Sequence, residues 1–156
     1  MGEKDNVEID GYEPLLLATQ EHYDLYWAQC VPLIDKVVAK AIYGEFTTDD
    51  IYNSATQGQM FVFICKKDEG EYPDVKFVIV MEHVQYPKLD ALNVVAIGGS
   101  QLNPLFKKFW EKLCGWAYMN GIRAIEALVS PAMARVITRF GFEHKYAQMR
   151  LNLNED

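Results

Sequence analysis

The stretch VVAIGGSQLNPLFKKFWEKL, residues 94–113, combines an apolar strand, a pair of glycines and the start of a helix. Asn103 and Pro104 are typical of a helix start, because the asparagine side chain caps free amides and proline already has a helical φ. Such a junction has two interpretations. Its amides and helix dipole can bind an anion such as a phosphate. Alternatively, Gly98 and Gly99 only permit a tight turn or a bulge.

The residues on either side predict a βαβ crossover. Residues 91–99 (ALNVVAIGG) and 122–129 (IRAIEALV) read as strands, and Gly121 ends the helix between them. Two strands joined in this way should be parallel, with a right-handed connection. The apolar side chains of the helix recur at helical spacing and are expected to pack in the core rather than form a cofactor box. They are Leu105, Phe106, Phe109, Leu113, Trp116 and Ala117.

The first part of the chain predicts one strand followed by helices. Residues 12–19 (YEPLLLAT) hold a short apolar run that indicates a strand. Residues 20–44 have helical spacing, but Pro32 favours a first helical turn, so we expect a break there and a helix end at Gly44. Residues 46–59 predict another helix, capped by a threonine.

The remaining segments complete a mixed sheet. Residues 60–67 and 75–86 predict an antiparallel hairpin. Ser130 and Pro131 open a short helix that ends at Gly141, and residues 142–153 (FEHKYAQMRLNL) are predicted as the last strand. The order predicts an α/β (α+β) fold in which a central mixed sheet has helices on both faces.

Bulk composition narrows the functional classes. The chain has 156 residues, half of them apolar, and a net charge of −7. We expect a flexible N-terminus (1–11) and a single domain (12–156). The negative charge disfavours nucleic acid as the main ligand and suits an amine-bearing partner. Without an apolar run long enough to span a bilayer or a recognisable signal peptide, we expect a cytoplasmic location and no membrane partner. The dispersed Cys30, Cys65 and Cys114 predict buried packing residues, with neither metal site nor disulfide.

The predicted order resembles the GCN5-related N-acetyltransferase (GNAT) fold, most strongly from Ala91 to Leu153. In detail the chain is most similar to acetyltransferase-like proteins of tailed phages and prophages, over roughly residues 24–153. The stretches that carry this resemblance are YWAQCVPLIDKVVAKAIYGEFTTDDI (26–51), MFVFI (60–64), VQYPKLDALNVVAIGGSQL (84–102), FWEKLCGWAYMNG (109–121) and NGIRAIEALVSPAMARVITRFGFEHKYAQMRL (120–151).

The resemblance implies a site for acetyl-CoA between the crossover strands. One strand would run along the pantetheine arm, and the loop after it would bind the pyrophosphate. Mapped onto this chain, these residues are Val95, Ala96 and Ile97 for the pantetheine, and Gly98, Gly99, Ser100, Gln101 and Leu102 for the pyrophosphate.

Three departures from the family pattern concern this site. The loop GGSQLNPL has its glycines early, lacks the usual arginine, and contains Pro104, which removes an amide donor. Ile137 stands where many members carry a tyrosine that protonates the departing thiolate. Tyr118 and Tyr146 are candidate substitutes. The asparagine common near the start of that helix is also missing from VSPAM (129–133).

Glu82 is the candidate catalytic base. In the family, a glutamate in this region can act as base, and an apolar strand would raise its pKa by desolvation. The alternative is that strand alternation points Glu82 at solvent. His83 must then face the opposite way. Glu126 either pairs with Arg123, the favoured interpretation, or lines an amine-binding cleft. Lys107, Lys108 and Lys112 either attract CoA phosphates or form a solvated helix face.

Three functions remain open from the sequence. The first is an acetyl-CoA-dependent N-acyltransferase in which an amine attacks the thioester directly. The second is a catalytically silent GNAT-fold phage virion or accessory protein that binds a phage or host protein. The third is an enzyme with another acyl or amino-acid donor, since fold does not fix chemistry.

Overall fold

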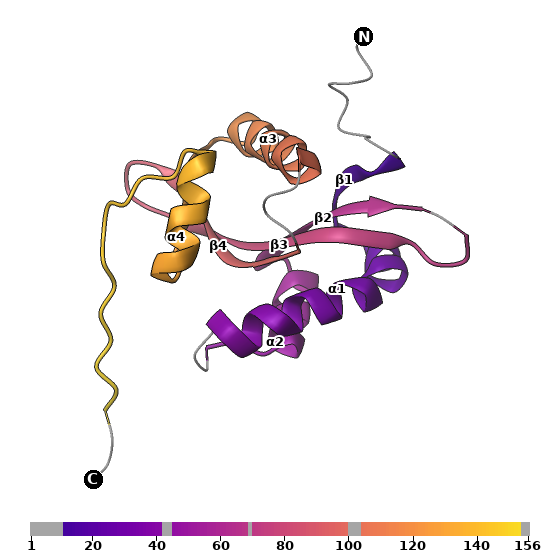
Figure 1. The fold of residues 1–156 in the computed structure, drawn as a ribbon, viewed down its shortest axis with the longest axis horizontal. Helices are drawn as coiled ribbons and strands as arrows, with labels where there is room; N and C mark the ends of the chain where they lie inside the picture. The colour runs from indigo at the N-terminus through magenta and orange to yellow at the C-terminus, as the bar shows by residue number, and fades with distance from the viewer. Residues whose placement is uncertain (1–10, 42–44, 69, 100–103, 154–156) are drawn as a thin grey trace.

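A five-stranded sheet forms the centre of the computed structural model, which describes residues 11–41, 45–68, 70–99 and 104–153 (Figure 1). Its strands follow chain order across the sheet: β1 (Glu13–Leu16), β2 (Met60–Lys67), β3 (Asp74–Gln85), β4 (Asp90–Gly98) and β5 (Ile122–Ala127). Neighbours are antiparallel from β1 to β4, whereas β4 and β5 are parallel. The predicted mixed sheet and the βαβ crossover are confirmed.

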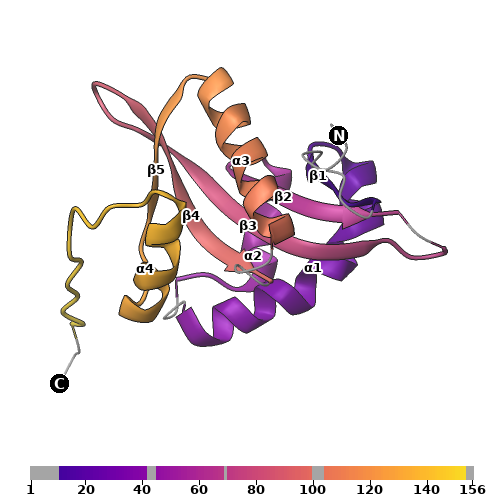
Figure 2. The same ribbon diagram turned by 45° about the horizontal axis from the view of Figure 1, so that its top comes forward.

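Helices cover both faces of the sheet (Figures 1 and 2). One face packs against α3 (Pro104–Met119) through a core that includes Phe77, Phe106 and Phe109. The other packs against α1 (Gln20–Ala41) and α2 (Thr48–Thr56). The aromatic stripe of α3 is therefore core packing, as predicted.

The helix α1 continues through Pro32, so the predicted break is wrong. Pro32 is exposed, which places the lost backbone hydrogen bond where water can replace it. Cys30 and Ile34, on either side of it, are fully buried in one core cluster. Packing of one continuous apolar stripe outweighs the local cost of the proline. Gly44, the predicted helix end, lies outside the described residues.

Replacing Pro32 with alanine should raise the free energy of unfolding by about 1 kcal/mol. Alanine restores a helical hydrogen bond, which stabilises the folded state. It also increases the conformational entropy of the unfolded chain, which offsets part of that gain. Urea denaturation of wild type and Pro32→Ala measures the difference. A variant less stable than wild type would contradict a continuous helix with a solvent-facing proline.

Local signals place the shorter helices as predicted. Thr47 caps α2, accepts a hydrogen bond from the Asp50 amide, and completes a reciprocal capping box with the Asp50 side chain. Ser130 caps α4 (Pro131–Ile137) by accepting from the Met133 amide. A 3-10 turn, η3 (Thr138–Phe140), follows and ends at Gly141, whose φ is +96°.

The predicted last strand does not form. Residues 142–153 have no regular secondary structure and pair with no strand in the described chain. After Phe142, which packs on Trp110 at 5.6 Å between ring centroids, the chain runs away from the sheet (Figure 2). Alternating side chains report strand propensity, but a strand forms only by pairing with another strand, and this segment does not pair with the open outer edge of β5.

Two of the cysteines are inert packing residues, as predicted. Cys30 and Cys65 are fully buried, and burial raises the pKa of both thiols to about 12. Such thiols carry almost no thiolate near neutral pH, and they are therefore unreactive. Cys114 is half-buried, and burial raises its pKa as well.

Within the described residues, no helix combines the length and the apolar character that crossing a membrane requires.

Candidate functional site between β4 and β5

The two parallel strands pair only over the first half of β4. Register partners run from Asp90 and Ile122 to Val94 and Ala127, where β5 ends. The last four residues of β4 therefore have no partner on β5, although three of them, Ala96, Ile97 and Gly98, still pair with β3. Half of one side of β4 is thus free of strand partners.

A bulge lies where this pairing stops. Val80 pairs with Ala96, while Met81 pairs with Val94. Val95 therefore has no opposite residue on β3, and none on β5. Bulges bend a strand and increase its local twist. This one lies where the paths of β4 and β5 separate.

Aromatic and aliphatic side chains fill the space beside the free half of β4. They come from β4, α3, α4, η3 and the residue after Gly141, and leave a partly open cavity of only about 10 Å³, about the room that one water molecule needs. The lining residues are Ile97, Phe106, Trp110, Ile137, Phe140 and Phe142. The strands therefore separate as the sequence predicted, but side chains occupy the space between them.

Ile137, which stands at the family's tyrosine position, is one of these lining residues. It is buried and has no proton to donate. Tyr118 lies near the far end of α3 from its N-terminus, about 20 Å away at 1.5 Å per residue. Tyr146 lies in the exposed C-terminal segment. Neither tyrosine stands beside Ile97, so the described residues supply no hydroxyl in place of the missing one there.

The glycine pair has a packing role. A Cβ on Gly98 would come within 2.9 Å of the Leu33 carbonyl oxygen, so this glycine permits the close approach of α1 to β4. Gly99 has a φ of +108°, a conformation that side chains rarely adopt. The turn interpretation of the two glycines is thus sufficient to explain them. Ser100, Gln101 and Leu102, the rest of the predicted phosphate cradle, lie outside the described residues.

A row of polar side chains crosses β3, β4 and β5 on the sheet face that α1 and α2 partly cover. Glu82 pairs in register with Asn93, which pairs with Glu126, and register partners on adjacent strands point to the same face. Asn93 Nδ2 donates to Glu82 Oε1 at 3.1 Å, and the Tyr86 hydroxyl donates to Glu126 Oε1 at 2.7 Å. We call these residues, Glu82, Tyr86, Asn93 and Glu126, the carboxylate row.

The carboxylate row is partly open to solvent. Glu82, Asn93 and Glu126 are half-buried, and Tyr86 is exposed. The hydrogen bond to the Glu126 carboxylate, followed by some desolvation, raises the pKa of Tyr86, because ionisation would place a second negative charge beside the first. The row thus presents two carboxylates at a solvent-accessible surface, an arrangement that suits a cationic amine.

Arg123 does not pair with Glu126, which corrects the favoured prediction. A bulge in β5 at Arg123 places its guanidinium 4.4 Å from the Tyr118 ring centroid. It donates to the carbonyl oxygens of Tyr118 and Ile122 at 3.2 and 3.1 Å. Glu126 instead belongs to the carboxylate row.

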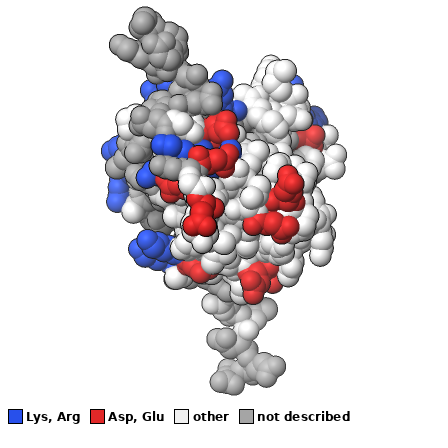
Figure 3. All heavy atoms as spheres, turned by 90° about the vertical axis from the view of Figure 1, so that its right-hand side faces the viewer, with Lys and Arg blue, Asp and Glu red and all other residues white. Residues whose placement is uncertain are grey.

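The other candidates lie apart from this row. His83 alternates with Glu82 and faces the other side, as predicted, where Nε2 lies 3.6 Å from Asp90 Oδ1. Lys107 and Lys112 are exposed on α3, and Lys108 is half-buried. On the side of the molecule at the right of Figure 1, acidic side chains gather over the centre and lower right of the view, and most basic side chains lie toward its left edge (Figure 3).

Sequence reasoning missed Asn93 and Tyr86. Their link to the two glutamates depends on strand register, which is shifted by one bulge in β4 and another in β5. Tyr86 also lies just outside β3, in the β3–β4 connection, where its amide bonds to the Leu89 carbonyl at 2.9 Å. The alternation of β4 was a usable signal, because Asn93 is a polar residue within an apolar strand.

Comparison with solved structures identifies the fold as that of the GCN5-related N-acetyltransferases, which confirms the fold prediction. No protein-family model and no curated protein matches the chain.

Three of the similar structures show how close the match in fold is and how low the sequence identity is. An aminoglycoside acetyltransferase from an uncultured soil metagenomic sample, in complex with sisomicin, has a TM-score of 0.65 at 13% identity, covering 93% of this chain and 98% of its own. Glucosamine-6-phosphate N-acetyltransferase from Arabidopsis thaliana has a TM-score of 0.62 at 12% identity, covering 92% of this chain and 99% of its own. A predicted acetyltransferase from Clostridium acetobutylicum, solved with acetyl-CoA, has a TM-score of 0.59 at 13% identity, covering 90% of this chain and 96% of its own.

Proposed function

We propose that this protein is an N-acyltransferase that uses acetyl-CoA and acetylates a cationic amine. The observation that carries the proposal is the free half of β4, residues 95–98, within a fold shared with acetyltransferases. One structure of this fold was solved with acetyl-CoA, and another, an aminoglycoside acetyltransferase, with sisomicin. The phage origin inferred from the sequence stays a prediction.

The fit of acetyl-CoA to the site is incomplete. The backbone fits, because Val95, Ala96 and Ile97 have peptide groups free of β5 that a pantetheine amide can bond. The side chains do not fit as they stand, because the cavity of about 10 Å³ holds no acyl-pantetheine. Binding in this groove would therefore require some of the side chains that line it to move.

Within the proposal, each set of residues has one role. Gly98 and Gly99, with Ser100, Gln101 and Leu102, would hold the pyrophosphate near the start of α3. The carboxylate row would bind the cationic acceptor, and Glu82, oriented by Asn93, would take the proton from its ammonium group. Bound acetyl-CoA would supply the thioester, whose C–S bond breaks as the amide forms, and the CoA thiolate would leave and take a proton from water.

Calorimetric titration with acetyl-CoA, followed by an assay of thiol release with polyamine and aminoglycoside acceptors, tests the proposal. We expect binding, with heat that saturates, and acceptor-dependent release of CoA. The absence of binding at millimolar acetyl-CoA would overturn it. The silent scaffold and the enzyme with another acyl or amino-acid donor would then be the remaining interpretations.

Replacing Glu82 with glutamine should lower kcat/KM for the amine about a hundredfold, the usual scale for loss of a general base. Acetyl-CoA affinity should stay unchanged, since Glu82 lies outside the groove beside Ile97. His83→Gln is the matched control, because it changes the neighbouring residue on the opposite face and should leave the rate unaltered. Equal rates for wild type and Glu82→Gln would remove Glu82 from the mechanism.

A further inference from the structure

One continuous segment of the chain supplies half of the side chains that fill the groove beside β4. It is made of α4, η3 and the two residues that follow them, residues 131–142 (Figure 2). Its contribution to the lining of the small cavity is Ile137, Phe140 and Phe142, and the rest of the lining comes from β4 and α3. We call residues 131–142 the closing segment.

The closing segment has no hydrogen bond to the sheet or to α3 within the described chain. Its hydrogen bonds run within residues 130–141, as between the Ala134 amide and the Ser130 carbonyl oxygen at 2.8 Å. Strands β1 to β5, in contrast, are joined by continuous pairing. Apolar contacts therefore hold this segment in place.

These apolar contacts are few. Ile137 is the only residue of the closing segment that is buried. The ring centroids of Phe140 and Phe106 lie 5.3 Å apart, and those of Phe142 and Trp110 lie 5.6 Å apart. Both Phe140 and Phe142 are only half-buried. Regions with few buried apolar contacts open at a lower free energy than the core of a sheet.

The chain on either side of the closing segment adds no strand pair. Residues 128–130, which lead from β5 into α4, are exposed and have no regular secondary structure. Residues 143–153 are exposed as well, and their contacts include an ion pair of Arg150 with Glu45. A surface ion pair of this kind contributes little. The closing segment can therefore turn away from β4 while the sheet stays paired.

We propose that residues 131–142 move as a unit and regulate access of acetyl-CoA to the groove beside β4. In the closed form, which the structure shows, the groove is filled. In the open form, Ile97 and the free peptide groups next to it are uncovered. This inference rests on the proposed function, because acetyl-CoA is the ligand that the groove would admit. A ligand that binds only the open form has an apparent affinity reduced in proportion to the fraction of open molecules.

Calorimetric titration of the full chain with acetyl-CoA tests the regulatory role. Phe142→Ala should bind acetyl-CoA about tenfold more tightly than wild type, because loss of the contact with Trp110 raises the fraction of open molecules. Phe61→Ala is the matched control. Phe61 is also half-buried and packs on a tryptophan of α3, Trp116, at 6.1 Å, but it lies outside the groove. It should leave the affinity unchanged.

Thiol labelling measures the opening without any ligand. The variant Ile137→Cys places a thiol on the buried side of the closing segment. Cys30 and Cys65 are fully buried in the core clusters, so in the same molecule they report unfolding of the whole domain. With iodoacetamide under native conditions and peptide mapping by mass spectrometry, we expect the thiol at position 137 to react at least tenfold faster than Cys65.

The two measurements separate this inference from the proposed function. Equal labelling rates at position 137 and at Cys65 would show that the segment moves only when the domain unfolds, and would overturn the inference. Equal acetyl-CoA affinities of wild type and Phe142→Ala would overturn it while leaving the proposed function intact. Binding by neither protein overturns the proposed function, and the regulatory role with it. Thermal melts check that the variants fold, and Phe140→Ala replaces Phe142→Ala if the latter does not.

Discussion

Replacing Gly99 with alanine should lower the free energy of unfolding by about 3 kcal/mol. The residue has a φ of +108°, in which a Cβ is strained. An added Cβ would also clash with the Lys76 carbonyl oxygen and would lie 2.8 Å from Phe77 Cδ1. Neither neighbour can withdraw, because Lys76 and Phe77 belong to β3 and Phe77 is fully buried.

Gly115→Ala is the matched control for this prediction. Gly115 lies inside α3, and a Cβ there would meet nothing within 4 Å. The same chemical change should therefore raise the free energy of unfolding by about 0.5–1 kcal/mol, the helix propensity difference. Urea denaturation of both variants measures the two opposite signs. A Gly99→Ala variant as stable as wild type would contradict the close approach of Gly99 to Lys76 and Phe77.

This comparison also bears on the ligand site. Loss of stability in Gly99→Ala shows only that packing requires a glycine. A separate loss of acetyl-CoA affinity, measured at a temperature where the variant is folded, would show that the loop also contacts the cofactor. The two roles of the glycine pair are therefore separable, although the sequence could not separate them.

Local signals predicted most of the fold because they act within a few residues. The strand at Met60–Lys67 and the capped helix at Thr48–Thr56 follow from apolar runs, capping residues and glycine stops. The predicted helix break at Pro32 was wrong because the rule that proline interrupts a helix considers only neighbouring residues and not tertiary packing. Tyr23, Tyr26, Cys30 and Ile34 form one buried stripe across the proline, and that stripe keeps the helix continuous.

The candidate site was predictable only in part, because register and side-chain packing are long-range properties. Glu82 was identified from its apolar strand. The polar neighbours of Glu82 depend on two bulges that leave no sequence signal. The filled groove beside Ile97 could not be foreseen, because its lining comes from segments as distant as β4 and Phe142.

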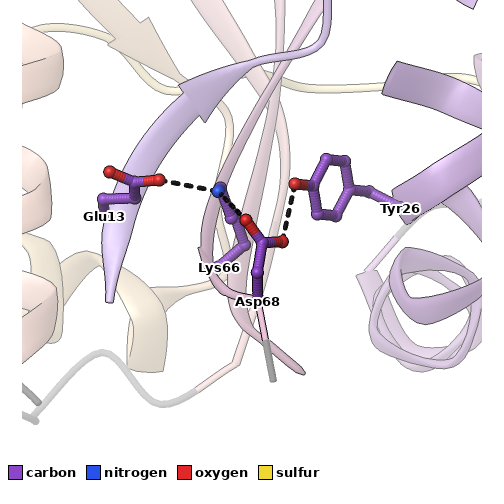
Figure 4. A network of polar contacts seen from close by, with 4 residues as sticks. All are labelled: Glu13, Tyr26, Lys66 and Asp68. Carbon is purple, nitrogen blue, oxygen red and sulfur yellow. Dashed lines mark hydrogen bonds and ion pairs between the residues drawn. The ribbon is translucent and has the colours of Figure 1, made fainter. Parts of the chain in front are cut away.

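A buried lysine, Lys66, links β1 to the end of β2 (Figure 4). Lys66 is only 6% exposed, and its Nζ lies 2.6 Å from Glu13 Oε1 and 2.7 Å from Asp68 Oδ2. The Tyr26 hydroxyl donates to the other oxygen of Asp68 at 2.8 Å, and the Tyr26 ring lies 5.5 Å from the ammonium. The network thus links β1, β2 and α1 around one desolvated charge.

Removing both carboxylates while keeping the lysine should cost about 2–3 kcal/mol of unfolding free energy, because the double variant Glu13→Gln, Asp68→Asn leaves a buried ammonium without a counter-charge. Lys66→Met is the matched control. It removes the buried charge, keeps an unbranched side chain, and leaves two carboxylates that are 43% and 64% exposed and can hydrate. Its stability should stay within about 1 kcal/mol of wild type. Equal losses in both variants would show that the ammonium is not desolvated.

The network also predicts a pH dependence with a definite sign. Hydrogen bonds from Lys66 and then from Tyr26 lower the pKa of Asp68. Its stabilising contribution is thus complete above the ordinary aspartate pKa of about 3.9, and is lost as the pH falls through the lower, folded value. Burial opposes the charge of Lys66, but hydrogen bonds to Asp68 and Glu13 outweigh it and raise the pKa of Lys66. That contribution is complete below the ordinary lysine pKa of about 10.4, and declines only above it.

Between these limits the stability difference between wild type and the double variant should be independent of pH, and it should shrink below about pH 4. Urea denaturation from pH 3 to pH 8 measures this, and a difference that grew on acidification would contradict the assigned ion pairs.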